Sequence, residues 1–158
     1  MSTVYLETSI PSYLAASPSR DIVVLSHQEL TRTWWNEERK DHDLFISEIV
    51  LDEISRGDPE FVEKRLQAIR EVEVLILKKG IEKLTEKYMS KYNFPEKLLN
   101  DMLHIAFAVY YEMDFLLTWN CKHIGNAYFK NQLARYNAII GHETPTICTP
   151  EELIRFYY

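Results

Sequence analysis

Glycine, cysteine and long apolar runs are scarce in this 158-residue sequence, and each scarcity excludes a class of protein. The four glycines do not cluster, which argues against a nucleotide-binding domain built on a glycine-rich phosphate loop. The two cysteines, Cys121 and Cys148, form no spacing motif, which favours a reduced, cytoplasmic protein over a disulfide-stabilised one. No run of 18 apolar residues occurs, and the N-terminus has no basic segment before an apolar stretch. We therefore expect no transmembrane helix, no membrane association and no signal peptide.

Positive charge is also in short supply. The chain has 18 Lys and Arg against 24 Asp and Glu, a formal net charge of −6 and a pI near 5.4. The overall charge gives no sign of nucleic-acid binding, so a phosphate-bearing ligand would need a local basic patch or a metal ion. The composition is otherwise that of a globular protein, with 46% hydrophobic and 13% aromatic residues. The length predicts one domain over residues 1–158.

Short apolar segments alternate with longer segments of helical spacing. The expected strands are 3–6, 44–46, 72–77, 114–118 and 146–148. The expected helices are 9–16, 21–40, 47–56, 59–70, 80–92, 96–113, 124–137 and the short segment 149–153, with Ser9, Ser47 and Thr149 as N-caps. Strands separated by helices require crossover connections. The pattern therefore predicts a four- to five-stranded parallel sheet covered on both faces, a three-layer α/β/α domain.

Polar side chains stand where such a sheet binds ligands, beyond the carboxyl ends of its strands. Glu7 ends the first expected strand, and Asn120 lies two residues past the strand 114–118. Glu53 and Asp101 border the apolar faces of their helices, where a carboxylate costs free energy unless something compensates it. If the three acids group around one point, Mg²⁺ or Mn²⁺ would relieve their repulsion. Such an ion retains waters that can attack a phosphodiester.

Four segments, taken in order, resemble PIN-domain ribonucleases, the family that includes VapC-type toxins of toxin–antitoxin pairs. They are "VYLETSIPSYL" (4–14), "FISEIVLDEI" (45–54), "NDMLHIAFAVYYEMDFLLTWN" (100–120) and "TPTICTPEEL" (144–153). The resemblance spans nearly the whole chain. It rests on the order of the set rather than on any single motif.

The resemblance implies a divalent-metal-dependent endoribonuclease that cleaves single-stranded RNA, of the kind that acts as the toxin of a type II toxin–antitoxin pair. Its implied partners are RNA and an antitoxin protein, and its implied assembly is a homodimer. The implied metal ligands are Glu7, Glu53, Asp101 and, as an auxiliary ligand, Asn120. The implied supporting hydroxyls, which fix the carboxylates or a water, are those of Thr8, Ser9 and Thr118.

Two positions depart from the family pattern, which usually has Asp at the first and fourth polar positions. Glu7 carries one extra methylene, which moves its carboxylate outward, and Asn120 lacks a negative charge. These differences leave a second hypothesis open. It is a PIN-like module that binds RNA or a protein partner without cleaving.

Simpler interpretations also exist for the single acids. Glu7 is also consistent with a solvated residue at a strand end. Glu53 is also consistent with an ion pair to Arg56 or Lys64. Asp101 is also consistent with an acid that only stabilises a helix N-terminus.

The remaining distinctive residues have structural interpretations. His104 is expected to be a satisfied helix residue, and the segment 121–123 to be a loop in which Lys122 can meet a phosphate. The aromatic pairs 34–35 and 110–111 are expected to form core or dimer contacts.

Overall fold

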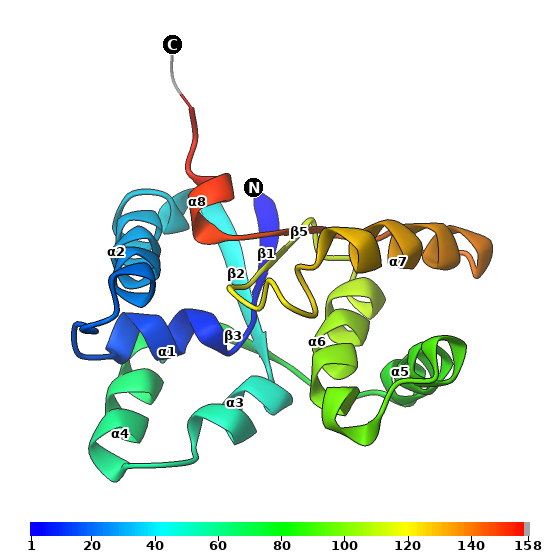
Figure 1. Cartoon of the computed structure of the whole chain (residues 1–158), viewed down its shortest axis with the longest axis horizontal. Coiled ribbons are helices and arrows are strands. Elements are labelled where there is room, and N and C mark those ends of the chain that lie inside the picture. Colours follow the sequence, from blue (N-terminus) through cyan, green and yellow to red (C-terminus); the bar gives the residue numbers. More distant parts are fainter. Residues whose placement is uncertain (157–158) are drawn as a thin grey trace.

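Five parallel strands form one sheet in the computed structural model, which describes residues 1–156 (Figure 1). They are β1 (Ser2–Leu6), β2 (His42–Ser47), β3 (Glu73–Leu75), β4 (Phe115–Leu117) and β5 (Thr146–Cys148). Their order in the sheet is β3-β2-β1-β4-β5. From the central strand β1, the chain adds β2 and β3 on one side of it and then crosses to add β4 and β5 on the other side. The strand order therefore reverses between β1 and β4, and the crevice at their carboxyl ends is where such sheets bind ligands.

Helices cover both faces of this sheet. They are α1 (Ser9–Ala15), α2 (Ile22–Glu37), α3 (Glu48–Ile54), α4 (Pro59–Ala68), α5 (Lys79–Tyr92), α6 (Leu99–Tyr110), α7 (Ala127–Ile139) and α8 (Pro150–Leu153), with short 3₁₀ turns η1 (Arg39–Asp41) and η2 (Glu96–Leu98). Helices α1, α2 and α4 lie on one side of the sheet, and α5 and α6 lie on the other (Figure 1). The hydrogen bond from the Tyr88 hydroxyl to Asn137 Oδ1, 2.7 Å long, joins α5 to α7. The three-layer prediction is confirmed, with five strands.

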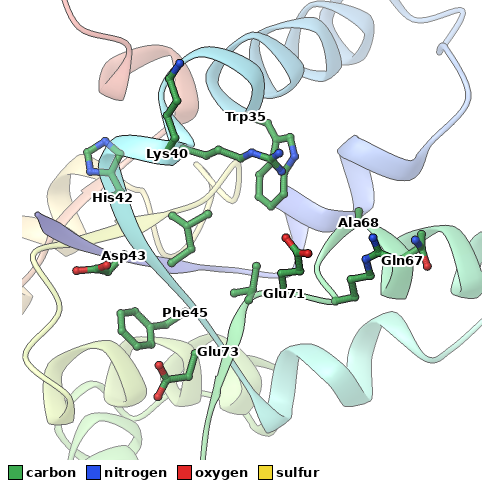
Figure 2. Close-up of a pocket in the computed structure, with 13 residues that line it drawn as sticks. Trp35, Lys40, His42, Asp43, Phe45, Gln67, Ala68, Glu71 and Glu73 are labelled. Atoms are coloured by element: carbon green, nitrogen blue, oxygen red, sulfur yellow. The ribbon is translucent and has the colours of Figure 1, made fainter.

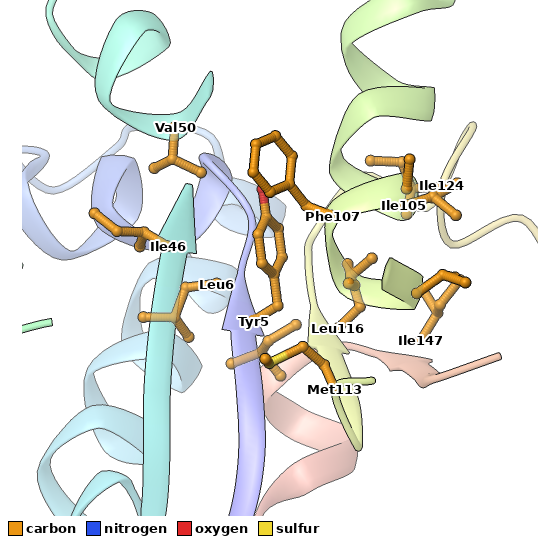
Figure 3. Close-up of a cluster of buried hydrophobic side chains, with 14 of the residues drawn as sticks. Tyr5, Leu6, Ile46, Val50, Ile105, Phe107, Met113, Leu116, Ile124 and Ile147 are labelled. Atoms are coloured by element: carbon orange, nitrogen blue, oxygen red, sulfur yellow. The ribbon is translucent and has the colours of Figure 1, made fainter. Parts of the chain in front are cut away.

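The core is continuous through the central strand. Val4, Tyr5 and Leu6 of β1 are all fully buried, as expected for a parallel strand covered on both faces. The Tyr5 ring points out of the sheet and stacks near Phe107 of α6, with ring centroids 6.5 Å apart (Figure 3). The sheet therefore anchors α6, the helix that carries two of the polar residues described below.

Two of the expected helix caps form and one does not. Ser47 caps α3 by accepting a hydrogen bond from the Val50 amide, and Thr149 forms a capping box with Glu152. Ser9 is not an N-cap; it is the first residue of α1, and its hydroxyl turns toward Glu7. The local pattern alone did not reveal that this hydroxyl has a carboxylate partner.

Several element boundaries differ from those expected. The expected strand 72–77 contracts to β3, and the expected helix 96–113 divides into η2 and α6, which ends at Tyr110. Glu112, at φ 54°, adopts a left-handed conformation that an α-helix cannot contain. Trp34 is a core residue as expected, whereas Tyr110 is 41% exposed. No helix within residues 1–156 is both long and apolar enough to cross a membrane.

Candidate functional site

Glu7 is the central carboxylate at the carboxyl ends of β1 and β4. It is only 7% exposed, so it is not a solvated residue at a strand end. Its Oε1 accepts hydrogen bonds from the hydroxyls of Ser9 and Thr118, both 2.6 Å long, and its Oε2 accepts one from the Ser9 amide at 3.2 Å. The Ser9 hydroxyl also accepts a hydrogen bond from the Trp119 amide at 2.9 Å. The first residue of α1 and the residue after β4 therefore hold this carboxylate together.

A second cluster, which we call the inner wall, consists of Tyr5, Thr8, Ser47, Glu53 and His104. Glu53 Oε1 accepts a hydrogen bond from the Thr8 hydroxyl at 2.7 Å and lies 2.6 Å from His104 Nε2. His104 Nδ1 lies 2.7 Å from the Tyr5 hydroxyl, which lies 2.7 Å from the Ser47 hydroxyl. The chain of contacts thus runs from the site into the core. Thr8 supports Glu53 rather than its neighbour Glu7.

The inner wall holds Glu53 as a carboxylate. Burial raises the pKa of Glu53, but the hydrogen bonds from His104 and from the Thr8 hydroxyl lower it by more, so the net pKa is below its ordinary value. Burial raises the pKa of Tyr5 well above its ordinary value, despite the opposing hydrogen bond from Ser47. Tyr5 therefore stays a protonated phenol. With a proton on Nε2, His104 donates to Glu53 and accepts from Tyr5, so every group in the chain has a partner.

A third cluster, which we call the outer rim, consists of Asp101, Asn120 and His123. Asp101, in the first turn of α6, accepts a hydrogen bond from Asn120 Nδ2 at 3.2 Å and lies 3.0 Å from His123 Nδ1. Asn120 Oδ1 accepts a hydrogen bond from the His123 amide at 3.1 Å. The backbone amide of Asn120 donates to the Thr118 hydroxyl at 2.9 Å. Because that hydroxyl donates to Glu7, the rim is connected to Glu7. His123, expected only as a loop residue, is thus a direct partner of Asp101.

The ion pairs considered for Glu53 do not form. Arg56 pairs with Asp52, and Lys64 pairs with Glu60 at 3.2 Å, both on the exposed sides of their helices. Glu53 turns the other way, toward Thr8 and α6. Glu53 therefore faces the candidate site, while the neighbouring acid Asp52 lies on the surface.

The seven residues singled out from the sequence fall into two hydrogen-bonded networks at this edge of the sheet. One joins Glu7, Ser9, Thr118, Asn120 and Asp101, and the other contains Thr8 and Glu53. No group of three or more His, Cys, Asp or Glu side chains within residues 1–156 is arranged to hold a metal ion. The binding of one ion by Glu7, Glu53 and Asp101 therefore stays a prediction. The donor chemistry does fit Mg²⁺ or Mn²⁺, because all the donors are carboxylate or amide oxygens. Glu53 Oε2 also accepts no hydrogen bond from the described residues.

Two hollows bear on the candidate site. One adjoins the candidate residues, and the other lies at the opposite edge of the sheet. A cleft of about 800 Å³ lies at the opposite edge, where β2 and β3 begin, and contains none of the candidate residues (Figure 2). It is lined by residues of both charges, among them Arg70, Glu71 and His42. A smaller hollow of about 340 Å³ borders the outer rim, and His123 is part of its lining. Only the smaller hollow adjoins the candidate site.

The family model of the PIN domain matches residues 4–120, a range that contains Glu7, Glu53, Asp101 and Asn120. The comparison with curated proteins gives no match. Among solved structures, VapBC2 from Rickettsia felis, bound to a DNA fragment from its promoter, superposes with a TM-score of 0.57 and 18% identity. That alignment covers 76% of this chain and 89% of the other.

A second solved structure has a similar fold. Mycobacterium tuberculosis VapC20, a toxin that cleaves the Sarcin-Ricin loop, superposes with a TM-score of 0.55 and 16% identity. The alignment covers 72% of this chain and 86% of that one. At such identities the two structures support the fold, while the family model covers well over half of the sequence. This chain therefore belongs to the PIN-domain family.

Proposed function

We propose that this protein is a divalent-metal-dependent endoribonuclease that cleaves single-stranded RNA. The observation that carries the proposal is the hydrogen-bonded network that joins Glu7, Asp101 and Asn120 at the carboxyl ends of β1 and β4, with Glu53 held beside it by Thr8, the residue after Glu7. Membership of the PIN-domain family supports it, because the four residues lie within the range matched by the family model. A partly buried, preorganised set of oxygen donors at this edge suits phosphodiester chemistry.

Glu7, Glu53 and Asp101 would hold the ion through carboxylate oxygens, with the Asn120 carbonyl oxygen as an auxiliary ligand. Asn120 Oδ1 accepts one hydrogen bond at present, and its second lone pair is available for this role. A bound Mg²⁺ or Mn²⁺ supplies charge stabilisation at the phosphate and makes water more acidic. The carboxylates would turn from some of their present partners to reach it.

The chain itself keeps these ligands charged and oriented. Ser9 and Thr118 hold Glu7 from two elements, so the longer Glu side chain is fixed despite its extra methylene. His104 holds Glu53 ionised, and His123 orients both Asp101 and Asn120. RNA phosphates would approach from the outer rim, where Lys122 is exposed.

We further propose that the protein acts as the toxin of a toxin–antitoxin pair, as a homodimer in the cytoplasm. The fold shared with VapBC2 and VapC20 supports an antitoxin partner. Apolar side chains exposed on the surface offer contact area for such partners; they include Ile22 at 80%, Val23 at 59% and Ile139 at 82% exposure. Co-expression with the protein of a neighbouring small open reading frame tests the pairing.

Cleavage of single-stranded RNA in the presence of Mn²⁺ tests the enzymatic proposal. Asp101→Asn and Glu53→Gln should each lower kcat/KM on the order of a hundredfold, as loss of one electrostatic stabiliser does. Asp52→Asn is the matched control, because Asp52 neighbours Glu53 but pairs with Arg56 on the surface. Activity unaffected by Asp101→Asn would overturn the proposal.

A second candidate is a module that binds RNA or a protein without cleavage. It is favoured because each of the three acids is already hydrogen bonded to protein partners and no metal-binding group of three acidic or histidine side chains forms in the described chain. Calorimetric titration with Mn²⁺ separates the two functions. Binding at physiological metal concentration favours the enzyme, and RNA binding without metal binding favours the module.

A further inference from the structure

We infer that the hollow beside the outer rim is a subsite for one unpaired RNA base next to the scissile phosphate. The inference rests on the proposed function, because it assumes that RNA lies across the outer rim. The end of α5, the start of α6 and the start of α7 form the hollow, which has a volume of about 340 Å³. That volume is near the lower end, about 300 Å³, of sites that hold small molecules. It suits a single nucleotide rather than a longer segment.

The position of the hollow ties it to the carboxylates. His123 lines the hollow, and its Nδ1 lies 3.0 Å from Asp101 Oδ2. Met102, the residue after Asp101, also lines it. A group bound in the hollow would therefore be separated from Asp101 by one side chain. This is the separation expected between a phosphate at the acids and the base of an adjoining nucleotide.

Aromatic rings supply the stacking surface. Tyr92 and Phe94 stack with ring centroids 5.2 Å apart, and Phe129 meets both edge-on, at 5.5 and 5.8 Å. Tyr128 stands at the mouth of the hollow and is 75% exposed. Every nucleobase has a face that stacks on such rings, and only an unpaired base can enter.

One polar atom in this aromatic cluster lacks a partner. The Tyr92 hydroxyl is buried and makes no hydrogen bond with any described residue. A buried hydroxyl without a partner costs free energy, and the polar edge of a base that opens the hollow enough to reach it would supply one. Asn126 and Gln132 add amide groups to the same lining. The hollow therefore combines apolar faces with polar groups, of which the Asn126 oxygen already accepts a hydrogen bond from the Phe129 amide.

The charge at the hollow complements a phosphate. Lys122 is the only Lys or Arg among the lining residues, and it forms no ion pair with any carboxylate within residues 1–156. In sequence it lies between Asn120 and His123, two residues of the outer rim. A nucleotide whose base fills the hollow would bring its phosphate to this lysine. In a chain of net charge −6, this is local compensation for an anionic substrate.

The test uses a single-stranded oligoribonucleotide that the protein cleaves, with one abasic ribose placed at each position in turn. One position beside the cut should raise KM about 5- to 100-fold, because one base loses its stacking partner. Tyr128→Ala should raise KM for the intact oligonucleotide by a similar factor with kcat nearly unchanged. The two increases in KM should not be additive when the variant is tested with the abasic oligonucleotide, since both changes remove the same contact. Tyr110→Ala, on an exposed tyrosine of α6 away from the hollow, is the matched control.

A second readout does not need cleavage. A single-stranded oligoribonucleotide carrying 2-aminopurine at each position in turn, without divalent metal, should lose fluorescence at one position on binding wild type and lose less on binding Tyr128→Ala. Normal metal-dependent cleavage with equal KM for every abasic position would overturn the subsite, leave the proposed function standing, and make the hollow a candidate protein contact. If wild type does not cleave RNA, the proposed function fails, and the fluorescence change alone decides the subsite.

Discussion

Glu53 and Asp101 both lie on helices and both contact a histidine, yet the two histidines differ in their surroundings. His104, the partner of Glu53, is 1% exposed, and its other ring nitrogen, Nδ1, contacts the hydroxyl of Tyr5 in the central strand. His123, the partner of Asp101, has a side chain that is 38% exposed and lies in the loop after β4. The inner wall is therefore continuous with the core, whereas the outer rim ends at the surface.

This difference indicates which groups can move when a ligand binds. The inner wall is a buried chain of polar groups in which each loss leaves another group without a partner. The outer rim can exchange its hydrogen bonds with water at little cost. We therefore expect inner-wall substitutions to change stability, and outer-rim substitutions to change substrate or metal binding while the fold stays intact.

The largest effect should come from His104→Ala. It opens a cavity beside the Tyr5 ring and leaves the Tyr5 hydroxyl and Glu53 without their shared partner, so the free energy of unfolding should fall by about 2–4 kcal/mol. Urea denaturation followed by circular dichroism measures this change. A loss below about 1 kcal/mol would mean that the inner wall is not coupled to the core.

Tyr5→Phe should have the next largest effect. The ring and its contact with Phe107 remain, but His104 Nδ1 and the Ser47 hydroxyl lose a partner in a buried place, which should cost about 1–3 kcal/mol. Thermal unfolding monitored by calorimetry measures it. Tyr13→Phe is the matched control, because no hydrogen bond to the Tyr13 hydroxyl is present among the described residues. Equal losses in the two variants would show that the chain from Tyr5 to Glu53 contributes nothing to stability.

The sheet and the ends of its strands were predictable because they follow from local patterns. A strand covered on both faces must be a continuous apolar run, and 3–6 is such a run ending at Glu7. Parallel connections then bring Glu7 and the residues after β4 to one edge, which is why the contact between Glu7 and Thr118 agrees with a supporting role for that hydroxyl.

The histidine contacts were not predictable, because they depend on how helices sit across the sheet. Glu53 and His104 are 51 residues apart in sequence, and Asp101 and His123 are 22 apart. No periodicity or cap links such positions, and a histidine on an apolar helix face reads as a core residue, which His104 also is. The resemblance to PIN-domain ribonucleases, which implies that Asp101 and Asn120 share one site, gave the only signal that the loop after β4 approaches α6.

His123→Ala should change stability by less than about 0.5 kcal/mol, because its ring is partly exposed and water can replace it at Asp101. The same substitution should lower kcat/KM for RNA cleavage. Expressed as free energy, this loss should exceed the change in stability, since Asp101 and Asn120 lose the group that orients them. Paired measurements of unfolding and kcat/KM check the contrast with His104→Ala. If both properties fall together in both variants, the distinction between inner wall and outer rim fails.

The smallest effect concerns the two thiols, one in the outer-rim loop and one in the sheet. Burial raises the pKa of Cys148 to about 12, whereas Cys121 is exposed beside Asn120. At pH 8 a thiol reagent should therefore titrate one cysteine in the native protein and both in denaturant. The pKa of Cys148 is higher in the folded protein than in the unfolded chain. Its contribution to the free energy of unfolding is therefore fully present below the unfolded pKa of about 8.5 and is lost as the pH rises toward the folded pKa. Equal labelling rates for the two thiols in the native protein would mean that β5 opens as readily as the loop, and the rim would no longer be the mobile side of the site.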